Sequence, residues 1–129
     1  MTTNRRVLLA RVPRGLPVPD DFAQDTVEAP APGPGQFLSR TLWLSLDPYL
    51  RNVMKGHPLY GVALRPGDPM FGETVAQVLE SRHADFSPGD FVVVKNGWQE
   101  YAVSDGQGVR RLDPGLAPLS SALGVLGMP

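Results

Sequence analysis

The stretch Pro88-Gly89-Asp90-Phe91-Val92-Val93-Val94 joins a tight turn to a short run of large apolar residues. Proline presets the backbone for the second position of a turn, and glycine accepts the positive φ that the third position of a type II turn requires. The run from Phe91 to Val94 is continuously apolar and mainly β-branched, which is typical of a strand buried on both faces. This stretch therefore predicts a buried strand entered from a Pro-Gly turn.

The same alternation of turns and short runs extends along the rest of the chain. Glycine and proline number 14 each, and many short strands separated by turn signals are typical of a β-barrel or a β-sandwich. A short helix or irregular turn is expected at residues 47–55 and again at 119–126, and residues 29–35 form a Pro-rich extended connection. The further predicted strands lie at residues 7–10, 37–46 (with Leu42, Leu44 and Leu46 on one face), 73–79, 99–103 and 109–112.

Size, charge and cysteine content exclude several classes of protein. The 129 residues fit one domain, which buries about two-thirds of its unfolded surface. The 12 basic and 13 acidic residues leave no basic surplus for a nucleic acid, and without cysteine there is neither a disulfide framework nor a thiolate zinc site. The apolar run near the N-terminus is shorter than the roughly 7–15 residues of a signal-peptide core, and no stretch approaches the ~20 apolar residues of a membrane span. We therefore expect a cytoplasmic protein with no nucleic-acid or membrane partner.

One segment suited to lining a pocket is Leu44-Ser45-Leu46-Asp47-Pro48-Tyr49-Leu50-Arg51. It joins a strand end to a loop, a place where functional side chains are disproportionately found. The ring and hydroxyl of Tyr49 suit a conjugated ketone or aldehyde. Alternatively, Asp47 caps the turn and Tyr49 packs on the barrel, and residue types alone favour this second interpretation.

A second such segment is Lys95-Asn96-Gly97-Trp98-Gln99-Glu100-Tyr101, which follows the buried strand. Lys95 and Asn96 stand at the strand end, where they could face a cleft. Trp98 is either a pocket wall or a core anchor, and aromatic side chains more often serve packing.

Several kinds of site have no signature in the sequence. His57 and His83 have no carboxylate or second histidine at ligand spacing, so no metal site is expected. There is no arrangement typical of a Ser-His-Asp or Cys-His nucleophile. Gly106 and Gly108 lie in a hairpin context rather than in the strand-to-helix loop that cradles a phosphate, so no nucleotide phosphate site is expected in this chain.

Taken together, four segments resemble the zinc-independent medium-chain reductases, in the branch of leukotriene B4 12-hydroxydehydrogenase, the prostaglandin reductases and the alkenal double-bond reductases. The segments are residues 44–51, Met70-Phe71-Gly72-Glu73-Thr74-Val75-Ala76, Gly97-Trp98-Gln99-Glu100-Tyr101, and Pro118 to Pro129. The resemblance implies a mainly β, GroES-like barrel with one or two short helices. It implies a substrate-side domain at residues 1–117, and a lead-in at 118–129 to an NADP-binding Rossmann domain beyond it, so that the chain reads as the N-terminal half of an enzyme.

The resemblance also assigns roles to individual residues. Tyr49 would border the cleft where substrate and nicotinamide meet, reversing the preference from residue type, and Lys95 and Asn96 would approach the substrate. Met128 and Pro129 would adjoin the cofactor, whereas Glu73 would be structural. No catalytic residue is assigned, and zinc is expected to be absent.

The implied activity of the intact protein is NADPH-dependent reduction of the activated C=C bond of an enone or enal. Hydride would reach the β-carbon and a proton the α-carbon, so the site must stabilise an enolate. The expected partners are the small-molecule substrate and the protein's own Rossmann domain, and the chain alone is expected to be inactive and to bind no cofactor. The alternatives are a non-enzymatic GroES-like binding module and a quinone reductase of the same superfamily.

The apolar residues near the C-terminus are expected to pack against the cofactor domain in the intact protein. In this chain by itself they would be covered by the barrel, by a second copy or by a neighbouring molecule, and we expect self-association or disorder there. A homodimer is therefore left open. The residues concerned are Leu119, Leu123, Val125, Leu126 and Met128.

Overall fold

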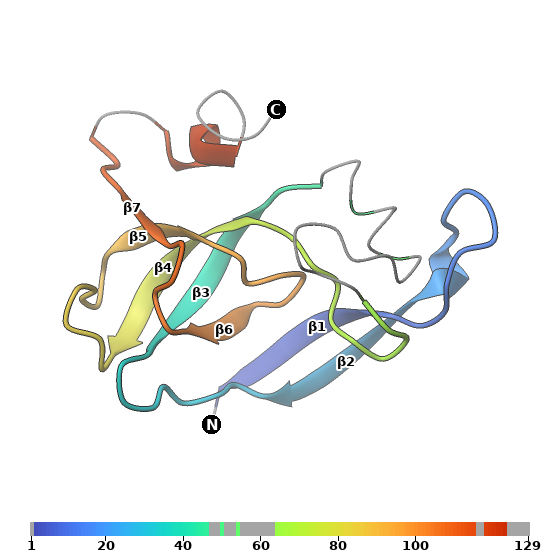
Figure 1. Cartoon of the computed structure of the whole chain (residues 1–129), viewed down its shortest axis with the longest axis horizontal. Helices are drawn as coiled ribbons and strands as arrows, with labels where there is room; N and C mark the ends of the chain where they lie inside the picture. The colour runs from blue at the N-terminus through green and yellow to red at the C-terminus, as the bar shows by residue number, and fades with distance from the viewer. Residues whose placement is uncertain (1, 47–49, 51–53, 55–63, 116–117, 124–129) are drawn as a thin grey trace.

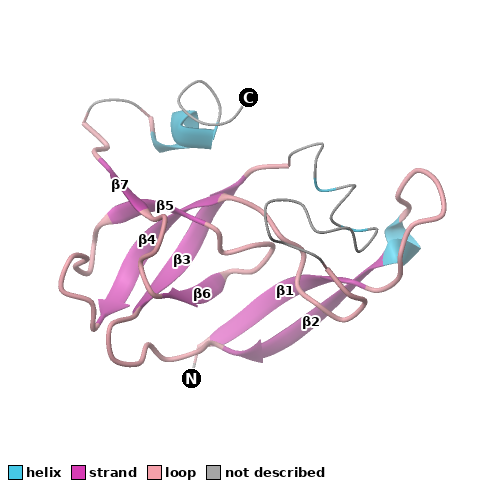
Figure 2. Ribbon diagram, viewed as in Figure 1, coloured by secondary structure: helices cyan, strands magenta, loops and turns pink. Residues whose placement is uncertain are grey.

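The computed structural model describes residues 2–46, 50, 54, 64–115 and 118–123. Antiparallel strands dominate it, in a two-stranded ribbon and a five-stranded sheet. The two lie side by side, with the ribbon along one edge of the molecule (Figure 1, Figure 2). The ribbon consists of β1 (Thr3–Leu9) and β2 (Phe22–Glu28). The short 3-10 helix η1 (Pro19–Asp21) lies between them and leads directly into β2. The sheet has the order β6-β3-β4-β5-β7, with β3 (Phe37–Leu44), β4 (Thr74–Ser81), β5 (Phe91–Val94), β6 (Tyr101–Ser104) and β7 (Arg110–Leu112), and η2 (Leu119–Leu123) is a second 3-10 helix.

Strand β1 links the ribbon to the sheet. Its Val7 amide donates to the carbonyl of Trp98 at 2.8 Å, and the Glu100 amide donates to the carbonyl of Arg5 at 3.1 Å. The amide of Met70, on the connection before β4, donates to the carbonyl of Val7 at 2.9 Å. These bonds tie β1 to the connections before β4 and before β6.

Strand β5 is buried on both faces, as its sequence predicts. On one face Val92 and Val94 join Phe37 and Phe86 in a core cluster. On the other face Val93 packs with Val75 of β4 and with η2. Because Val92, Val93 and Val94 are buried and Phe91 is half-buried, apolar side chains suit every position of the strand.

Leu42, Leu44 and Leu46, predicted to share one face of residues 37–46, do not form a buried face. The inward positions of β3 are Phe37 and Ser39, both buried, whereas Leu42 is exposed and Leu46, beyond the strand, is 70% exposed. The register of β3 against β4 shifts between Thr41 and Trp43. A bulge of this kind redirects the side chains that follow it, so simple alternation along the sequence does not identify the buried face.

The described part of the C-terminal segment is covered by the sheet. Leu119 and Leu123 pack against Val75 and Val93, and Ala122 is only 2% exposed. Leu119 and Leu123 are therefore covered by the barrel itself, which is one of the three possibilities expected from the sequence. Val125, Leu126 and Met128 lie outside the described residues. Self-association of the chain stays a prediction.

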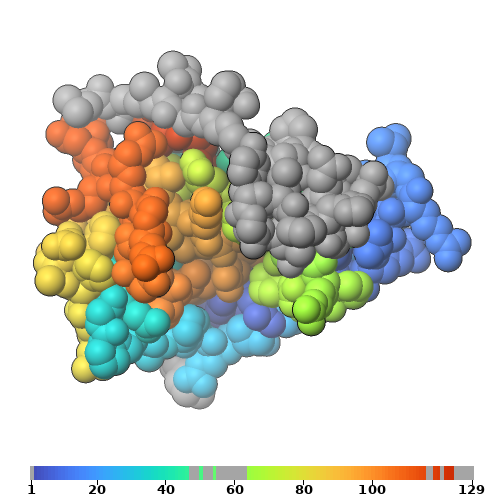
Figure 3. Space-filling model, viewed as in Figure 1, coloured from blue at the N-terminus to red at the C-terminus, as the bar shows by residue number. Residues whose placement is uncertain are grey.

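At the opposite end of the molecule, the loop between β1 and β2 projects from the body (Figure 3). Leu16 at its tip is almost fully exposed. Among the residues that the structure describes, no helix combines the length and apolarity needed to cross a membrane.

Candidate functional site

Three strand ends meet at one edge of the five-stranded sheet. The amide of Ser45, just after β3, donates to the carbonyl of Glu73, just before β4, at 2.9 Å. The amide of Gly97, after β5, donates to the carbonyl of Gly72 at 3.0 Å. Antiparallel neighbours run in opposite directions, so the ends of β3 and β5 flank the start of β4 (Figure 1). We call residues 44–46, 70–73 and 95–98 the strand-end edge.

The segment that follows β3 leaves from this edge. Asp47, Pro48 and Tyr49 lie outside the described residues, so the placement of Tyr49 at a cleft stays a prediction. Of the helix or turn predicted at 47–55, Leu50 and Met54 are described, and both are helical. Met54 is described and buried, and it shares a core cluster with Met70 of the strand-end edge. The chain therefore returns to the edge within a few residues of Tyr49.

Gly97 makes the turn that brings the chain back from β5. Its φ is +74°, and a Cβ placed there would lie 2.5 Å from the carbonyl oxygen of Met70. Only glycine combines this backbone conformation with such a close approach. The turn allows the amide of Trp98 to donate to the same Met70 carbonyl at 2.9 Å.

The structure places the two predicted substrate-contact residues of this segment in opposite environments. Asn96 is 4% exposed, and its side-chain amide donates to the hydroxyl oxygens of Ser39 at 3.0 Å and Thr41 at 3.2 Å. Lys95 is exposed, and its Nζ lies 5.8 Å from the centre of the Phe71 ring. Lys95 can therefore meet a ligand directly, whereas the amide nitrogen of Asn96 is already engaged inside the fold.

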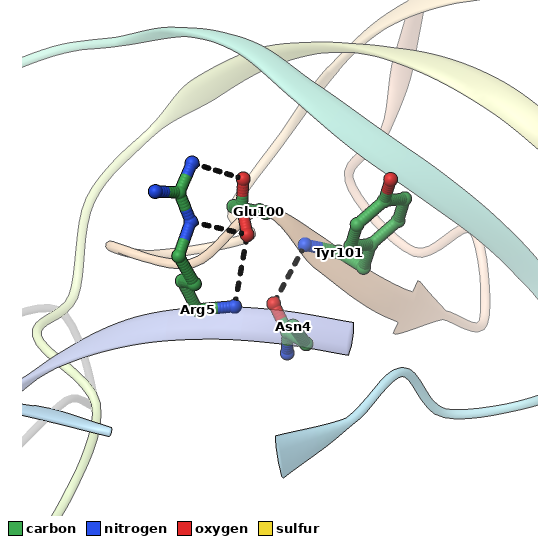
Figure 4. A network of polar contacts seen from close by, with 4 residues as sticks. All are labelled: Asn4, Arg5, Glu100 and Tyr101. Atoms are coloured by element: carbon green, nitrogen blue, oxygen red, sulfur yellow. Dashed lines mark hydrogen bonds and ion pairs between the residues drawn. The ribbon is translucent and has the colours of Figure 1, made fainter. Parts of the chain in front are cut away.

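A partly buried polar chain, which the sequence did not reveal, continues from Asn96 to the ribbon. The carbonyl of Asn96 accepts a hydrogen bond from Nε2 of Gln99 at 2.8 Å. Oε1 of Gln99 accepts one from Nδ2 of Asn4 at 3.1 Å. Oδ1 of Asn4 accepts one from the Tyr101 amide at 3.0 Å (Figure 4). Such partners satisfy polar groups that would otherwise be costly to bury. The strand-end edge is thus fixed relative to β1.

An ion pair reinforces this link at the surface. Nε and Nη2 of Arg5 each lie 3.0 Å from a carboxylate oxygen of Glu100, which also accepts a bond from the Arg5 amide (Figure 4). These hydrogen bonds hold the pKa of Glu100 below its ordinary value. A groove of about 570 Å³ opens beside the pair, between the ribbon and the strand-end edge; its lining includes Val7, Thr26, Thr41, Leu44 and Trp98.

Trp98 joins the ribbon to the strand-end edge. Its ring stacks on Phe22 with centroids 5.8 Å apart and an interplanar angle of 17°. Its indole nitrogen is sealed from solvent and has no hydrogen-bond partner in the described part of the chain. The ring lies against Gly72 and close to Leu44. Trp98 therefore serves packing, as its residue type favours, while also lining the groove.

Within the described ranges, no group of three or more His, Asp or Glu side chains is arranged to hold a metal ion. His83 packs edge-on against Phe37 and Phe86, and its Nδ1 accepts a bond from the Asp85 amide at 3.0 Å. His57 lies outside the described residues. The expected absence of zinc stays a prediction.

Comparison with known proteins relates this arrangement to reductases. The chain is 44% identical over 126 residues to the NADPH-dependent curcumin reductase of Escherichia coli, covering 98% of this chain and 36% of that protein. It is 42% identical over 118 residues to prostaglandin reductase 1 of Rattus norvegicus, covering 89% and 34%. It is 35% identical over 132 residues to the NADP(+)-dependent 2-alkenal reductase of Nicotiana tabacum, covering 98% and 38%. The chain thus spans about a third of the length of these relatives.

Solved structures agree with the fold. The crystal structure of CurA from Vibrio vulnificus in complex with NADPH superposes with a TM-score of 0.88 at 40% identity, covering 97% of this chain and 37% of that one. This agreement confirms the predicted mainly β, GroES-like fold. The family model for the N-terminal domain of oxidoreductase matches residues 5–112. The chain therefore belongs to this family of oxidoreductase N-terminal domains, in the branch that contains the curcumin, prostaglandin and 2-alkenal reductases.

Proposed function

We propose that the protein to which this chain belongs reduces the activated C=C bond of enones or enals with NADPH, and that this chain forms the substrate-side wall. The observation that carries the proposal is the 44% identity, over 98% of the chain, with an NADPH-dependent curcumin reductase. Two further relatives, a prostaglandin reductase and a 2-alkenal reductase, match nearly the same residues.

The described residues suit a wall better than a dinucleotide site. The two 3-10 helices, η1 and η2, span three and five residues. Neither offers the glycine-rich strand-to-helix turn that binds a pyrophosphate. When bound, NADPH supplies the hydride, and in our proposal a Rossmann domain entered through residues 118–129 holds it, with Met128 and Pro129 beside it.

The strand-end edge is the part of this chain that would meet the substrate. It carries one exposed cation, Lys95, beside the ring of Phe71, and it leads directly into the segment with Tyr49. The polar chain from Asn96 to Asn4 holds this edge in place. Its role would be to position the substrate.

The test is steady-state turnover of the full-length protein with NADPH, using an enone and a quinone in parallel. We expect consumption of NADPH with the enone and formation of its saturated ketone. Preference for the quinone would favour the quinone-reductase alternative, and no turnover of either would favour a binding module.

The isolated chain of 129 residues should bind no NADPH, because the described residues lack a phosphate cradle. Titration calorimetry checks this directly. Binding in the micromolar range would show that the cofactor site lies within this chain and would contradict our proposal that a separate Rossmann domain binds the cofactor.

A further inference from the structure

We propose that Lys95 is a catalytic residue whose ammonium group stabilises the enolate oxygen that forms during reduction. The inference rests on the proposed function and adds a residue role to it. It is drawn from the position of Lys95 on the strand-end edge, from its freedom to meet a ligand and from the way its neighbours fix its backbone.

Lys95 is the cation of the strand-end edge. The charged residues in 44–46, 70–73 and 95–98 are Glu73 and Lys95. Among the described residues the ion pairs are Arg5–Glu100, Arg6–Asp25 and Arg11–Asp21, so Lys95 is not neutralised by Glu73 or by another described carboxylate. Its positive charge is therefore available to an incoming group.

The backbone of Lys95 is held on both sides. Before it, the carbonyl of Val94 accepts a hydrogen bond from the hydroxyl of Thr74 at 2.6 Å. After it come the buried amide of Asn96 and the turn at Gly97, where the lack of a side chain permits close contact with Met70. A charge on a fixed backbone loses less entropy on meeting its partner than one on a loose loop.

The side chain of Lys95 rests beside an aromatic face. Its Nζ lies 5.8 Å from the centre of the Phe71 ring, within the range of about 6 Å in which a ring attracts a cation. The ring holds the ammonium at the surface of the strand-end edge. This placement suits a conjugated carbonyl compound whose oxygen meets the ammonium.

The proposed reaction develops a negative charge that a cation can stabilise. Hydride from the nicotinamide forms a new C–H bond at the β-carbon, and the electron pair of the C=C π bond moves toward the carbonyl, whose oxygen becomes negative. Water then supplies a proton to the α-carbon, the C=O bond is restored, and the hydroxide left behind takes up a proton from the solvent. Because the negative charge exists only after hydride arrival has begun, an ammonium at the oxygen lowers the barrier rather than merely tightening substrate binding.

The test uses the full-length protein and Lys95→Gln, with the hydride-transfer rate followed in a single turnover by NADPH absorbance. A buried oxyanion donor contributes about 10²–10³ in rate, and an exposed ammonium contributes less, so we expect a loss of about tenfold in both the single-turnover rate and kcat/KM. Lys95→Arg should restore most of the rate, because it returns the charge. Arg82→Gln is the matched control, since it removes the same charge from an exposed site at the other end of β4.

Each outcome decides the matter. An unchanged single-turnover rate in Lys95→Gln, or a rise in KM alone, overturns the role of Lys95 while leaving the reductase assignment intact. An equal loss in Arg82→Gln also overturns it, because the effect would then be one of net charge. A wild-type protein that reduces no enone would instead remove the proposed function itself.

Discussion

At the scale of single residues, Gly97 determines the shape of the strand-end edge. Its φ of +74° and the 2.5 Å between a Cβ and the Met70 carbonyl oxygen exclude any side chain without movement of the backbone. We expect Gly97→Ala to lower the free energy of unfolding by about 2–4 kcal/mol, from the left-handed conformation and the steric overlap together. Chemical denaturation of the isolated chain measures this loss.

Gly89 provides the matched control for that substitution. Its φ is also positive, at +94°, but a Cβ there meets nothing within 4 Å. Gly89→Ala should therefore incur only the conformational part, about 1–2 kcal/mol. Equal losses at Gly97 and Gly89 would show that contact with Met70 contributes nothing.

Asn96 offers a second residue-scale prediction. Replacing it by leucine leaves the buried hydroxyl of Ser39 and the half-buried hydroxyl of Thr41 without their donor, and we expect a loss of about 1–3 kcal/mol in the free energy of unfolding. Adding Ser39→Ala and Thr41→Val should recover part of this loss, because the polar groups then disappear together. A triple variant less stable than Asn96→Leu alone would contradict the explanation.

At the scale of elements, the ribbon of β1 and β2 carries a pH-dependent contribution to stability. Nη2 of Arg6 lies 2.6 Å from Oδ2 of Asp25, and these hydrogen bonds hold the pKa of Asp25 below its ordinary value. The pKa of Glu100 is lowered in the same way by Arg5. A lowered folded-state pKa gives stability that is complete above the unfolded pKa of about 4 and is lost as the pH falls through the folded value.

We therefore expect the free energy of unfolding to decline from about pH 5 downward, and Asp25→Asn to reduce the slope. Both pairs are partly exposed, so the effect should shrink at high ionic strength. Denaturation midpoints between pH 2 and 7 would measure it. Asp85→Asn, at a carboxylate in no ion pair among the described residues, is the control, and a slope reduced equally there would argue against the ribbon pair.

The elements also show what the sequence could and could not predict. Strand β5 was predictable because burial on both faces leaves an uninterrupted apolar run. Strand β2 was missed because the ribbon is open to solvent and Phe22-Ala-Gln-Asp-Thr-Val-Glu alternates too weakly to be read as a strand. Its pairing with β1 comes from tertiary hydrogen bonds, which override weak local preference.

The candidate site shows the same limit. A strand-end location for Lys95 and Asn96 followed from their place after an apolar run. The sequence did not predict the burial of Asn96, because the hydroxyl groups that it contacts lie 57 and 55 residues away along the chain. Such partners become visible only when β3 and β5 are both placed beside β4.

At the scale of the whole molecule, η2 closes one face of the sheet. Ala122 is buried against Val75 and Val93. We expect Ala122→Asp to lower the free energy of unfolding by more than about 2 kcal/mol, because a carboxylate there has no partner and must be desolvated or expel η2 from the sheet. Thermal and chemical denaturation measure the effect. Ala84→Asp introduces the same side chain at an exposed position and should be nearly silent; similar losses for both would mean that η2 contributes little.

The contrast between the two tryptophans gives the chain a built-in optical probe. Trp43 is 52% exposed, whereas Trp98 is stacked on Phe22 with its indole nitrogen sealed. Iodide should therefore quench the fluorescence in two phases, and Trp43→Phe should leave a single, blue-shifted and poorly quenched emission. A fully quenchable signal from that variant would mean that Trp98 is open to solvent. Because Trp98 belongs to the strand-end edge, its fluorescence should change when a ligand binds at that edge.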